Sequence, residues 1–182
     1  MTSKPSKKRI LLFGASGTIG HAVLTHLNDE GNEIVCVTRP ASQAKLPAGI
    51  ARIEADVTDA IAMRIVYESG RFDAVISCMA SRSGAPADAW SIDHHANALA
   101  LQGAKHAGVK QFVLLSAICV QKPRLAFQHA KLAFEKELID SGLTWSIVRP
   151  TAYFKSLSGQ LERVKSGKPF LVFGNGQLTA CK

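Results

Sequence analysis

Short apolar runs alternate with longer amphipathic stretches along most of this chain. The apolar runs are rich in Val, Ile and Leu, and their brevity favours strands that are buried on both faces. The longer stretches repeat apolar residues about every three or four positions, which is typical of helices with one face against a core. Strands are therefore expected at residues 9–13, 33–37, 50–54, 72–77, 111–116 and 144–148.

The amphipathic stretches place a helix after almost every predicted strand. Glycines follow several of them, as is common where a helix ends: Gly31, Gly70, Gly108 and Gly142. Helices are expected at residues 18–28, 56–69, 89–107, 127–141 and 157–165, and a short strand at residues 169–173.

Strands and helices in strict alternation predict an α/β fold. We expect a Rossmann-type, doubly wound parallel sheet that is covered by helices on both faces, with strands in the order 3-2-1-4-5-6. The last short strand lacks an obvious partner in the sequence. We therefore expect this chain to be the first part of a larger protein, with most of the C-terminal region missing.

The composition fits one folded domain. The 182 residues are 47% hydrophobic and 20% charged, which suffices for one core and is unlike a disordered chain. No apolar run approaches the length of a membrane span, and residues 1–9 lack the apolar middle of a signal peptide. We expect a cytoplasmic protein of bacterial type.

The chain is basic, with 22 lysines and arginines against 14 acidic residues and a net charge of +8. Part of the excess lies in Lys4, Lys7, Lys8 and Arg9, and we interpret residues 1–8 as a solvated, flexible tail. A basic surface can also attract nucleic acid, an acidic membrane or an anionic substrate. Because no segment matches a nucleic-acid-binding motif, we expect no nucleic-acid partner.

The cysteines do not suggest a metal site. Cys36, Cys78, Cys119 and Cys181 form no C-x-x-C pair, and most lie in or beside apolar runs. We expect reduced, buried thiols and no bound metal.

A glycine-rich turn between the first strand and the first helix carries the clearest chemical signal. Its spacing, G-x-x-G-x-x-G, allows a tight turn, a close approach of phosphate to the backbone, and close packing of the helix on the sheet. The amide groups and the dipole of the helix then favour an anion. The alternative is a plain glycine turn. The predicted dinucleotide-binding residues are Gly14, Ala15, Ser16, Gly17, Thr18, Ile19 and Gly20.

The end of the second strand selects between the two nicotinamide dinucleotides. An NAD site usually has an acidic residue here, which binds the ribose 2′-hydroxyl. This chain has Arg39, with Ser42 close behind, and a guanidinium matches a 2′-phosphate in charge and geometry. We predict NADPH as the cofactor. The alternative is an exposed arginine without a ligand.

The glycine spacing resembles that of the short-chain dehydrogenase/reductase superfamily, in its extended or atypical branches. The resemblance implies that Asp56 contacts the adenine edge and that Val57 packs on the ring, although Asp56 or Thr58 could instead cap the next helix. It also implies that Ser77 and Cys78 lie under the cofactor, by position only.

The usual Tyr-x-x-x-Lys pair of that superfamily is incomplete. In the family, the tyrosine donates a proton and the lysine holds the nicotinamide ribose. Here Phe127 takes the place of the tyrosine and Lys131 is kept, so we expect a role for Lys131 in cofactor binding and catalysis. The alternative is a surface lysine. Ser116 occupies the position of the family's catalytic serine, but its role without the tyrosine stays open.

Longer segments give a closer resemblance. Residues 114–123 (LLSAICVQKP), 127–135 (FQHAKLAFE), 146–157 (SIVRPTAYFKSL) and 167–169 (GKP) are similar to the NADPH-dependent divinyl chlorophyllide a 8-vinyl-reductase family, including the phenylalanine. The resemblance implies reduction of the 8-vinyl group of a magnesium tetrapyrrole to an ethyl group, in chlorophyll or bacteriochlorophyll biosynthesis. It places Pro150 and Phe154 at the cofactor, with Tyr153 and Lys155 near the substrate, and leaves room for peripheral association with a photosynthetic membrane.

We therefore expect three parts: the basic tail at residues 1–8, an NADP-binding Rossmann domain at 9–156, and the start of a substrate-binding region at 157–182. Two other functions fit the loss of the tyrosine. One is a non-catalytic NADP-binding sensor or assembly factor of the NmrA-like type, and the other is a reductase of a different activated alkene. The oligomeric state is left open.

Overall fold

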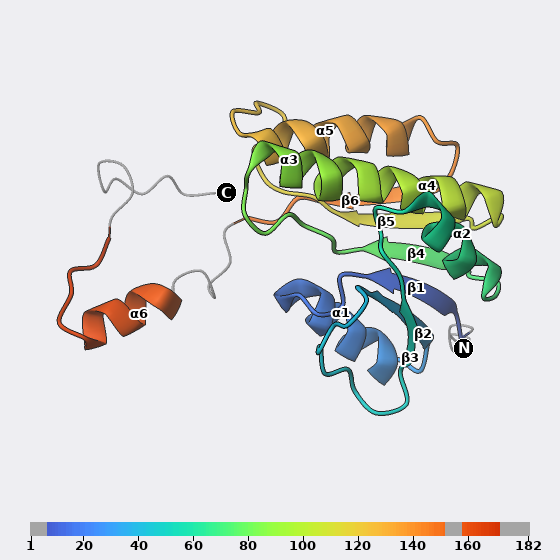
Figure 1. Ribbon diagram of the computed structural model, residues 1–182, viewed down its shortest axis with the longest axis horizontal. Coiled ribbons are helices and arrows are strands. Elements are labelled where there is room, and N and C mark those ends of the chain that lie inside the picture. The colour runs from blue at the N-terminus through green and yellow to red at the C-terminus, as the bar shows by residue number, and fades with distance from the viewer. Residues whose placement is uncertain (1–6, 152–157, 172–182) are drawn as a thin grey trace, which may run out of the picture.

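The computed structural model describes residues 7–151 and 158–171 of the chain. A six-stranded parallel sheet forms its centre, with the strands in the order β3-β2-β1-β4-β5-β6 (Figure 1). The predicted Rossmann-type sheet and its strand order are thus confirmed. The strands are β1 (Arg9–Phe13), β2 (Glu33–Thr38), β3 (Ala51–Glu54), β4 (Ala74–Ser77), β5 (Gln111–Leu115) and β6 (Thr144–Val148).

Helices follow the strands much as expected, but two of them differ from the prediction. The third predicted helix begins earlier, at Pro86, and contains a π-helical segment, η1. The second begins later, at Ala60. The helical elements are α1 (Thr18–Asp29), α2 (Ala60–Glu68), α3 (Pro86–Ala89), η1 (Trp90–Ala96), α4 (Asn97–His106), α5 (Ala126–Ile139) and α6 (Ser158–Lys165).

The late start of α2 follows from its N-cap. The carboxylate of Asp59 accepts hydrogen bonds from the backbone N–H groups of Ile61 (2.7 Å) and Ala62 (3.1 Å), which satisfies amides that have no partner inside the helix. The alternative interpretation, in which Asp56 or Thr58 caps this helix, is therefore wrong. Their side chains are used in a turn of their own, before the helix.

Two hydrophobic layers hold the sheet. On one face, a large core packs the strands against α2, α4 and α5, with Phe112, Phe134 and Leu138 fully buried. On the other face, α1 packs through Leu24 against the β1 and β2 side chains in a smaller core. Figure 1 shows α3, α4 and α5 on one side of the sheet and α1 on the other.

The expected cover on both faces is incomplete over β5 and β6. Val113 and Leu115 of β5 point away from the large core and are only half-buried, and Val148 of β6 is exposed. The predicted helix after β6 forms as α6, but it lies apart from the sheet (Figure 1). No strand forms over residues 169–171, and residues 172–173 lie outside the described residues.

The cysteines differ in their exposure. Cys36 is buried and Cys78 half-buried, but Cys119 is exposed, so the expectation of buried thiols is wrong for Cys119; Cys181 lies outside the described residues. Within residues 7–151 and 158–171, no helix is long and apolar enough to cross a bilayer. The same residues contain no group of three His, Cys, Asp or Glu side chains placed to hold a metal.

Candidate functional site

The glycine turn packs tightly against the end of the neighbouring strand. Gly14 adopts a left-handed backbone conformation (φ +77°), and a Cβ there would lie 2.5 Å from the carbonyl oxygen of Cys78. A Cβ on Gly20 would lie 2.1 Å from the carbonyl oxygen of Gly14. Side chains at either position would therefore push the turn away from β4 or from α1, so both positions require glycine.

Gly17 has a different role in the same turn. It is the N-cap residue of α1, its φ of −78° suits any residue, and its N–H donates to the Gly14 carbonyl at 3.0 Å. A Cβ there would lie 3.3 Å from that carbonyl oxygen, which is tight but tolerable. What glycine provides here is open space beside the first turn of α1, where an anion can approach the helix N-terminus.

A cleft of about 320 Å³ opens at the carboxyl ends of β1, β2 and β4, beside this turn. In open α/β sheets this edge is where ligands bind. It brings together predicted residues from distant parts of the sequence, and it adds residues that were not predicted. The lining residues are Gly14, Ser16, Gly17, Val37, Thr38, Arg39, Ser42, Val57, Cys78, Met79, Ala80, Arg82, Asp88 and Ile92.

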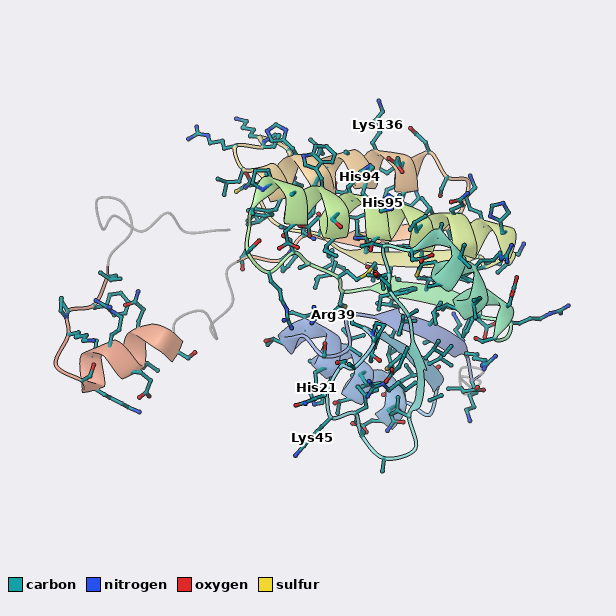
Figure 2. The ribbon with its side chains drawn as sticks, viewed as in Figure 1. His21, Arg39, Lys45, His94, His95 and Lys136 are labelled. Carbon is teal, nitrogen blue, oxygen red and sulfur yellow. The ribbon has the colours of Figure 1, made fainter. Side chains whose placement is uncertain are left out.

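One wall of the cleft is the loop after β2. Arg39 is exposed there, and its carbonyl accepts from the N–H of Ser42 at 3.1 Å. The Arg52 guanidinium on β3 donates to the Ser42 carbonyl (2.7 Å) and to Glu54 (2.6 Å), which braces the loop. Figure 2 shows Arg39 between the layer of α1 and the layer of α3, far from Lys136. Arg39 is thus free to receive an anion from the cleft.

The opposite wall is the loop between β4 and α3. The Asp88 carboxylate accepts from the N–H groups of Arg82 and Ser83 (2.9 Å each) and from the Ser83 hydroxyl (2.7 Å). These hydrogen bonds, led by the backbone bond from Ser83, lower the pKa of Asp88. Because Oδ2 of Asp88 accepts these three bonds within the loop, the two guanidinium groups of Arg39 and Arg82 dominate the charge of the cleft and suit phosphate.

The end of β3 supplies an apolar contact. Val57 is buried and lines the cleft. The Asp56 carboxylate instead accepts from the hydroxyl (2.7 Å) and the N–H (2.9 Å) of Thr58, and these bonds lower the pKa of Asp56. A contact of Asp56 with an adenine edge stays a prediction.

Lys131 is not a surface residue. It is 5% exposed, and its Nζ lies 3.0 Å from Oδ1 of Asp93 and 3.5 Å from the Leu115 carbonyl. Burial raises the pKa of the half-buried Cys78 to about 11, while the charge of Lys131 acts on it in the opposite direction. Lys131 is not among the residues that line the cleft, but its charge acts on Cys78, which is. We therefore call the region of Lys131 and Asp93 the inner end of the cleft.

Other predicted residues are likewise not among those that line the cleft. Phe127 is half-buried one turn before Lys131, at the start of α5. The Ser116 hydroxyl is buried and finds no hydrogen-bond partner among the described residues. Pro150 is half-buried, and its carbonyl accepts from the N–H of Ile118 at 3.0 Å. Phe154 lies outside the described residues, as do Tyr153 and Lys155.

Sequence reasoning missed Asp93 and Asn97 of the π-helical region. The Asn97 amide donates to the carbonyls of Ile92 (3.1 Å) and Asp93 (3.2 Å), and its oxygen accepts from the Ser77 hydroxyl at 2.6 Å. A signal for Asp93 was present: it is a single acid on the same helical face as Ala89 and Ala96, where its burial would require a cationic partner.

A nicotinamide dinucleotide fits these residues. The glycine turn leaves room for phosphate at α1, and the cleft bears guanidinium groups on both walls and an apolar surface from Val57. The buried ammonium of Lys131 adds a hydrogen-bond donor at the inner end.

Several known proteins are similar to this chain in sequence or in fold. The chain is 45% identical over 194 aligned positions to "Divinyl chlorophyllide a 8-vinyl-reductase, chloroplastic" of Oryza sativa subsp. indica, an alignment that covers 98% of this chain and 48% of the relative. The predicted resemblance is thus confirmed. The photosystem II assembly factor Ycf39 of Guillardia theta is 27% identical over 154 positions, covering 83% of this chain and 48% of that protein. This chain spans about half the length of these relatives.

Among solved structures, the Bordetella bronchiseptica enzyme WbmG in complex with NAD superimposes with a TM-score of 0.79 at 22% identity. The match covers 92% of this chain and 63% of WbmG, and it supports the Rossmann-type fold. A family model described as NAD(P)H-binding matches residues 14–177, which include the glycine turn, Arg39 and Lys131. The chain therefore belongs to this family of NAD(P)H-binding proteins.

Proposed function

We propose that this chain binds NADPH and serves the reduction of the 8-vinyl group of a divinyl chlorophyllide to an ethyl group. The observation that carries the proposal is the 45% identity over 98% of the chain to a relative of that name. The replacement of the catalytic tyrosine by Phe127 supports it, because reduction of a carbonyl would need a proton donor at that position.

Residues on both sides of the cleft would hold the cofactor. The glycine turn and the start of α1 receive the pyrophosphate, with hydrogen bonds from Ser16 and Thr18. Arg39 and Ser42 receive the adenosine 2′-phosphate, which supports NADPH over NADH because the end of β2 has no carboxylate to bind a free 2′-hydroxyl. Val57 packs on the adenine, and Lys131 holds the nicotinamide ribose.

When bound, NADPH supplies the hydride that one vinyl carbon accepts. The protein must then orient the nicotinamide and keep its ribose fixed, which we assign to Lys131 and to the strand ends at Ser77 and Cys78. A vinyl group needs one proton on its second carbon. Phe127 has no proton to give, so this proton comes from water or from another residue.

Residues 9–156 form the NADP-binding domain, and residues from 157 onward begin the region that receives the tetrapyrrole. The magnesium belongs to the substrate. We place the protein in the cytoplasm, at the periphery of a photosynthetic membrane.

Turnover tests this proposal. The 182-residue chain, and a chimaera in which it replaces the matching 48% of the rice relative, are incubated with NADPH and divinyl chlorophyllide. The expected result is a shift of the pigment bands from divinyl to monovinyl type with the chimaera, together with oxidation of NADPH. Bands that stay of divinyl type with a chimaera that folds and binds NADPH would contradict the proposed activity.

The similarity to the assembly factor Ycf39 favours one second candidate, a non-catalytic dinucleotide-binding protein. In this function, the glycine turn would bind NADPH as a ligand, and the protein would not use it as a reductant. The same incubation separates the two functions, since this candidate predicts tight NADPH binding without any loss of NADPH absorbance in the presence of pigment.

A further inference from the structure

Asp93 and Lys131 form an ion pair that is sealed from solvent. Their side chains are 1% and 6% exposed, and their charged atoms lie 3.0 Å apart. Asp93 comes from η1 and Lys131 from α5, so the pair joins two elements that are distant in sequence. It lies where β4 and β5 end, behind Cys78.

An irregular helix makes this contact. η1 is a seven-residue π-helical segment, and such segments frequently occur at functional sites. Asn97 fixes it, because its amide donates to the carbonyls of Ile92 and Asp93 while its oxygen accepts from Ser77 on β4. These hydrogen bonds tie the backbone of η1 at Asp93 to the carboxyl end of β4.

Fold stability does not account for such a pair. The free energy that two buried charges lose on dehydration is barely offset by their attraction. Apolar residues of similar size often give a fold of equal or higher stability. Glu135 and Arg149 offer a comparison: Glu135 is equally buried, but the Arg149 side chain is 33% exposed and stays hydrated. The Asp93–Lys131 pair has no such access to water, so a role for the fixed ammonium explains it better.

Asp93 also holds the wall of the cleft. Its two carboxylate oxygens lie 3.3 and 3.4 Å from the backbone nitrogen of Ser81, which precedes Arg82 in the loop between β4 and α3. The Lys131 ammonium has three N–H donors. One donates to Asp93, and a second donates to the Leu115 carbonyl in a long hydrogen bond of 3.5 Å. One N–H is left without a partner among the described residues.

We propose that Asp93 is a positioning residue, which holds the ammonium of Lys131 at the inner end of the cleft for the nicotinamide ribose of the dinucleotide. This inference rests on the proposed binding of NADPH. Asp93 does not touch the cofactor; it acts through Lys131. Asp93→Asn removes the charge but keeps an oxygen that can accept from the Ser81 N–H, so it weakens binding of the nicotinamide half and leaves the adenine half unaffected.

Calorimetric titration with two ligands tests this role. NADPH has both halves, whereas 2′,5′-ADP has the adenine half and the 2′-phosphate but no nicotinamide ribose. Asp93→Asn and Lys131→Met are each expected to lower the affinity for NADPH about tenfold, the loss of one charge-assisted hydrogen bond, with the affinity for 2′,5′-ADP unchanged. Glu135→Gln is the matched control, because it alters a buried pair elsewhere on α5 and should change neither affinity.

The double variant Asp93→Asn/Lys131→Met shows whether the aspartate acts through the lysine. It is expected to bind NADPH as Lys131→Met alone does, because the two changes remove one interaction. This comparison also decides the matter if Asp93→Asn does not fold, since the double variant contains no unpaired buried charge. A further loss of NADPH affinity in the double variant, or equal losses for NADPH and 2′,5′-ADP in Asp93→Asn, would overturn the inference. An unmodified chain that binds no NADPH would instead contradict the proposed function.

Discussion

Lys131 and Glu135 lie one turn apart on α5, and both buried side chains form ion pairs with other elements. Lys131 pairs with Asp93 of η1, while Glu135 receives two hydrogen bonds from the guanidinium of Arg149, just after β6. The two pairs differ in their access to water, because only Arg149 is partly exposed. That difference gives distinct stability predictions.

Lys131→Met is expected to lower the free energy of unfolding by about 3–5 kcal/mol, because it leaves the buried carboxylate of Asp93 unpaired. Glu135→Gln should cost about 1–2 kcal/mol, since Arg149 can be hydrated and glutamine still accepts a hydrogen bond. Urea unfolding followed by circular dichroism measures both. The addition of Asp93→Asn to Lys131→Met should restore much of the loss. Equal costs for the two single variants would contradict this description of the pairs.

Two glycines of the turn have different roles: we expect Gly17 to leave space for a ligand, whereas Gly20 leaves space that the fold itself needs. Gly17→Ala is expected to weaken binding of NADPH by about tenfold or more and to change the melting temperature little, because its φ is ordinary and its Cβ is tolerated. Gly20→Ala should unfold the turn, since its Cβ would lie 2.1 Å from a backbone oxygen. Thermal melts with and without NADPH distinguish them. A Gly17→Ala variant with unchanged affinity would show that phosphate does not approach this residue.

We predict that Arg39 selects NADPH over NADH. Arg39→Asp is expected to reduce the affinity for NADPH by about a hundredfold or more and to affect NADH much less, because the aspartate repels a 2′-phosphate and can accept from a 2′-hydroxyl. Lys136→Asp changes the net charge equally on the far side of the molecule (Figure 2) and serves as the control. Equal losses for both dinucleotides in Arg39→Asp would show that Arg39 does not bind the 2′-phosphate.

The rate at which the Cys78 thiol is alkylated should show whether NADPH occupies the cleft. Burial raises its pKa to about 11, so at pH 8 it is almost entirely protonated and reacts slowly with iodoacetamide. Between pH 8 and 10 its thiolate fraction, and hence its rate, should rise about tenfold per pH unit. NADPH should slow this reaction by covering the thiol, and the exposed Cys119 should be unaffected by NADPH. Peptide mass spectrometry follows each site. Labelling of Cys78 at an unchanged rate with saturating NADPH would place the cofactor elsewhere.

The sheet was predictable because its rules are local. Short runs of Val, Ile and Leu between amphipathic stretches predicted all six strands and their order, and the glycine turn was placed correctly between β1 and α1. Where two residues compete as the cap of α2, the sequence pattern could not choose, and Asp59 was overlooked. The cap depends on which side chain reaches the free amides, which is a matter of geometry.

The inner end of the candidate site was less predictable. Lys131 was recognised from its spacing to Phe127, but its burial was not, because its partner Asp93 lies 38 positions earlier in a segment whose π-helical turn has no sequence signature. Arg82 was missed for a similar reason: the loop that carries it is fixed by the Asp88 carboxylate, and only the folded loop brings it to the cleft.

Binding of NADPH and NADH to the unmodified chain tests the central claim most directly. In calorimetric titrations at one salt concentration, NADPH should bind to one site per chain, at least about tenfold more tightly than NADH, because the guanidinium of Arg39 interacts with the 2′-phosphate. Binding of NADH with equal or higher affinity, or no binding of either dinucleotide by the folded chain, would contradict the account.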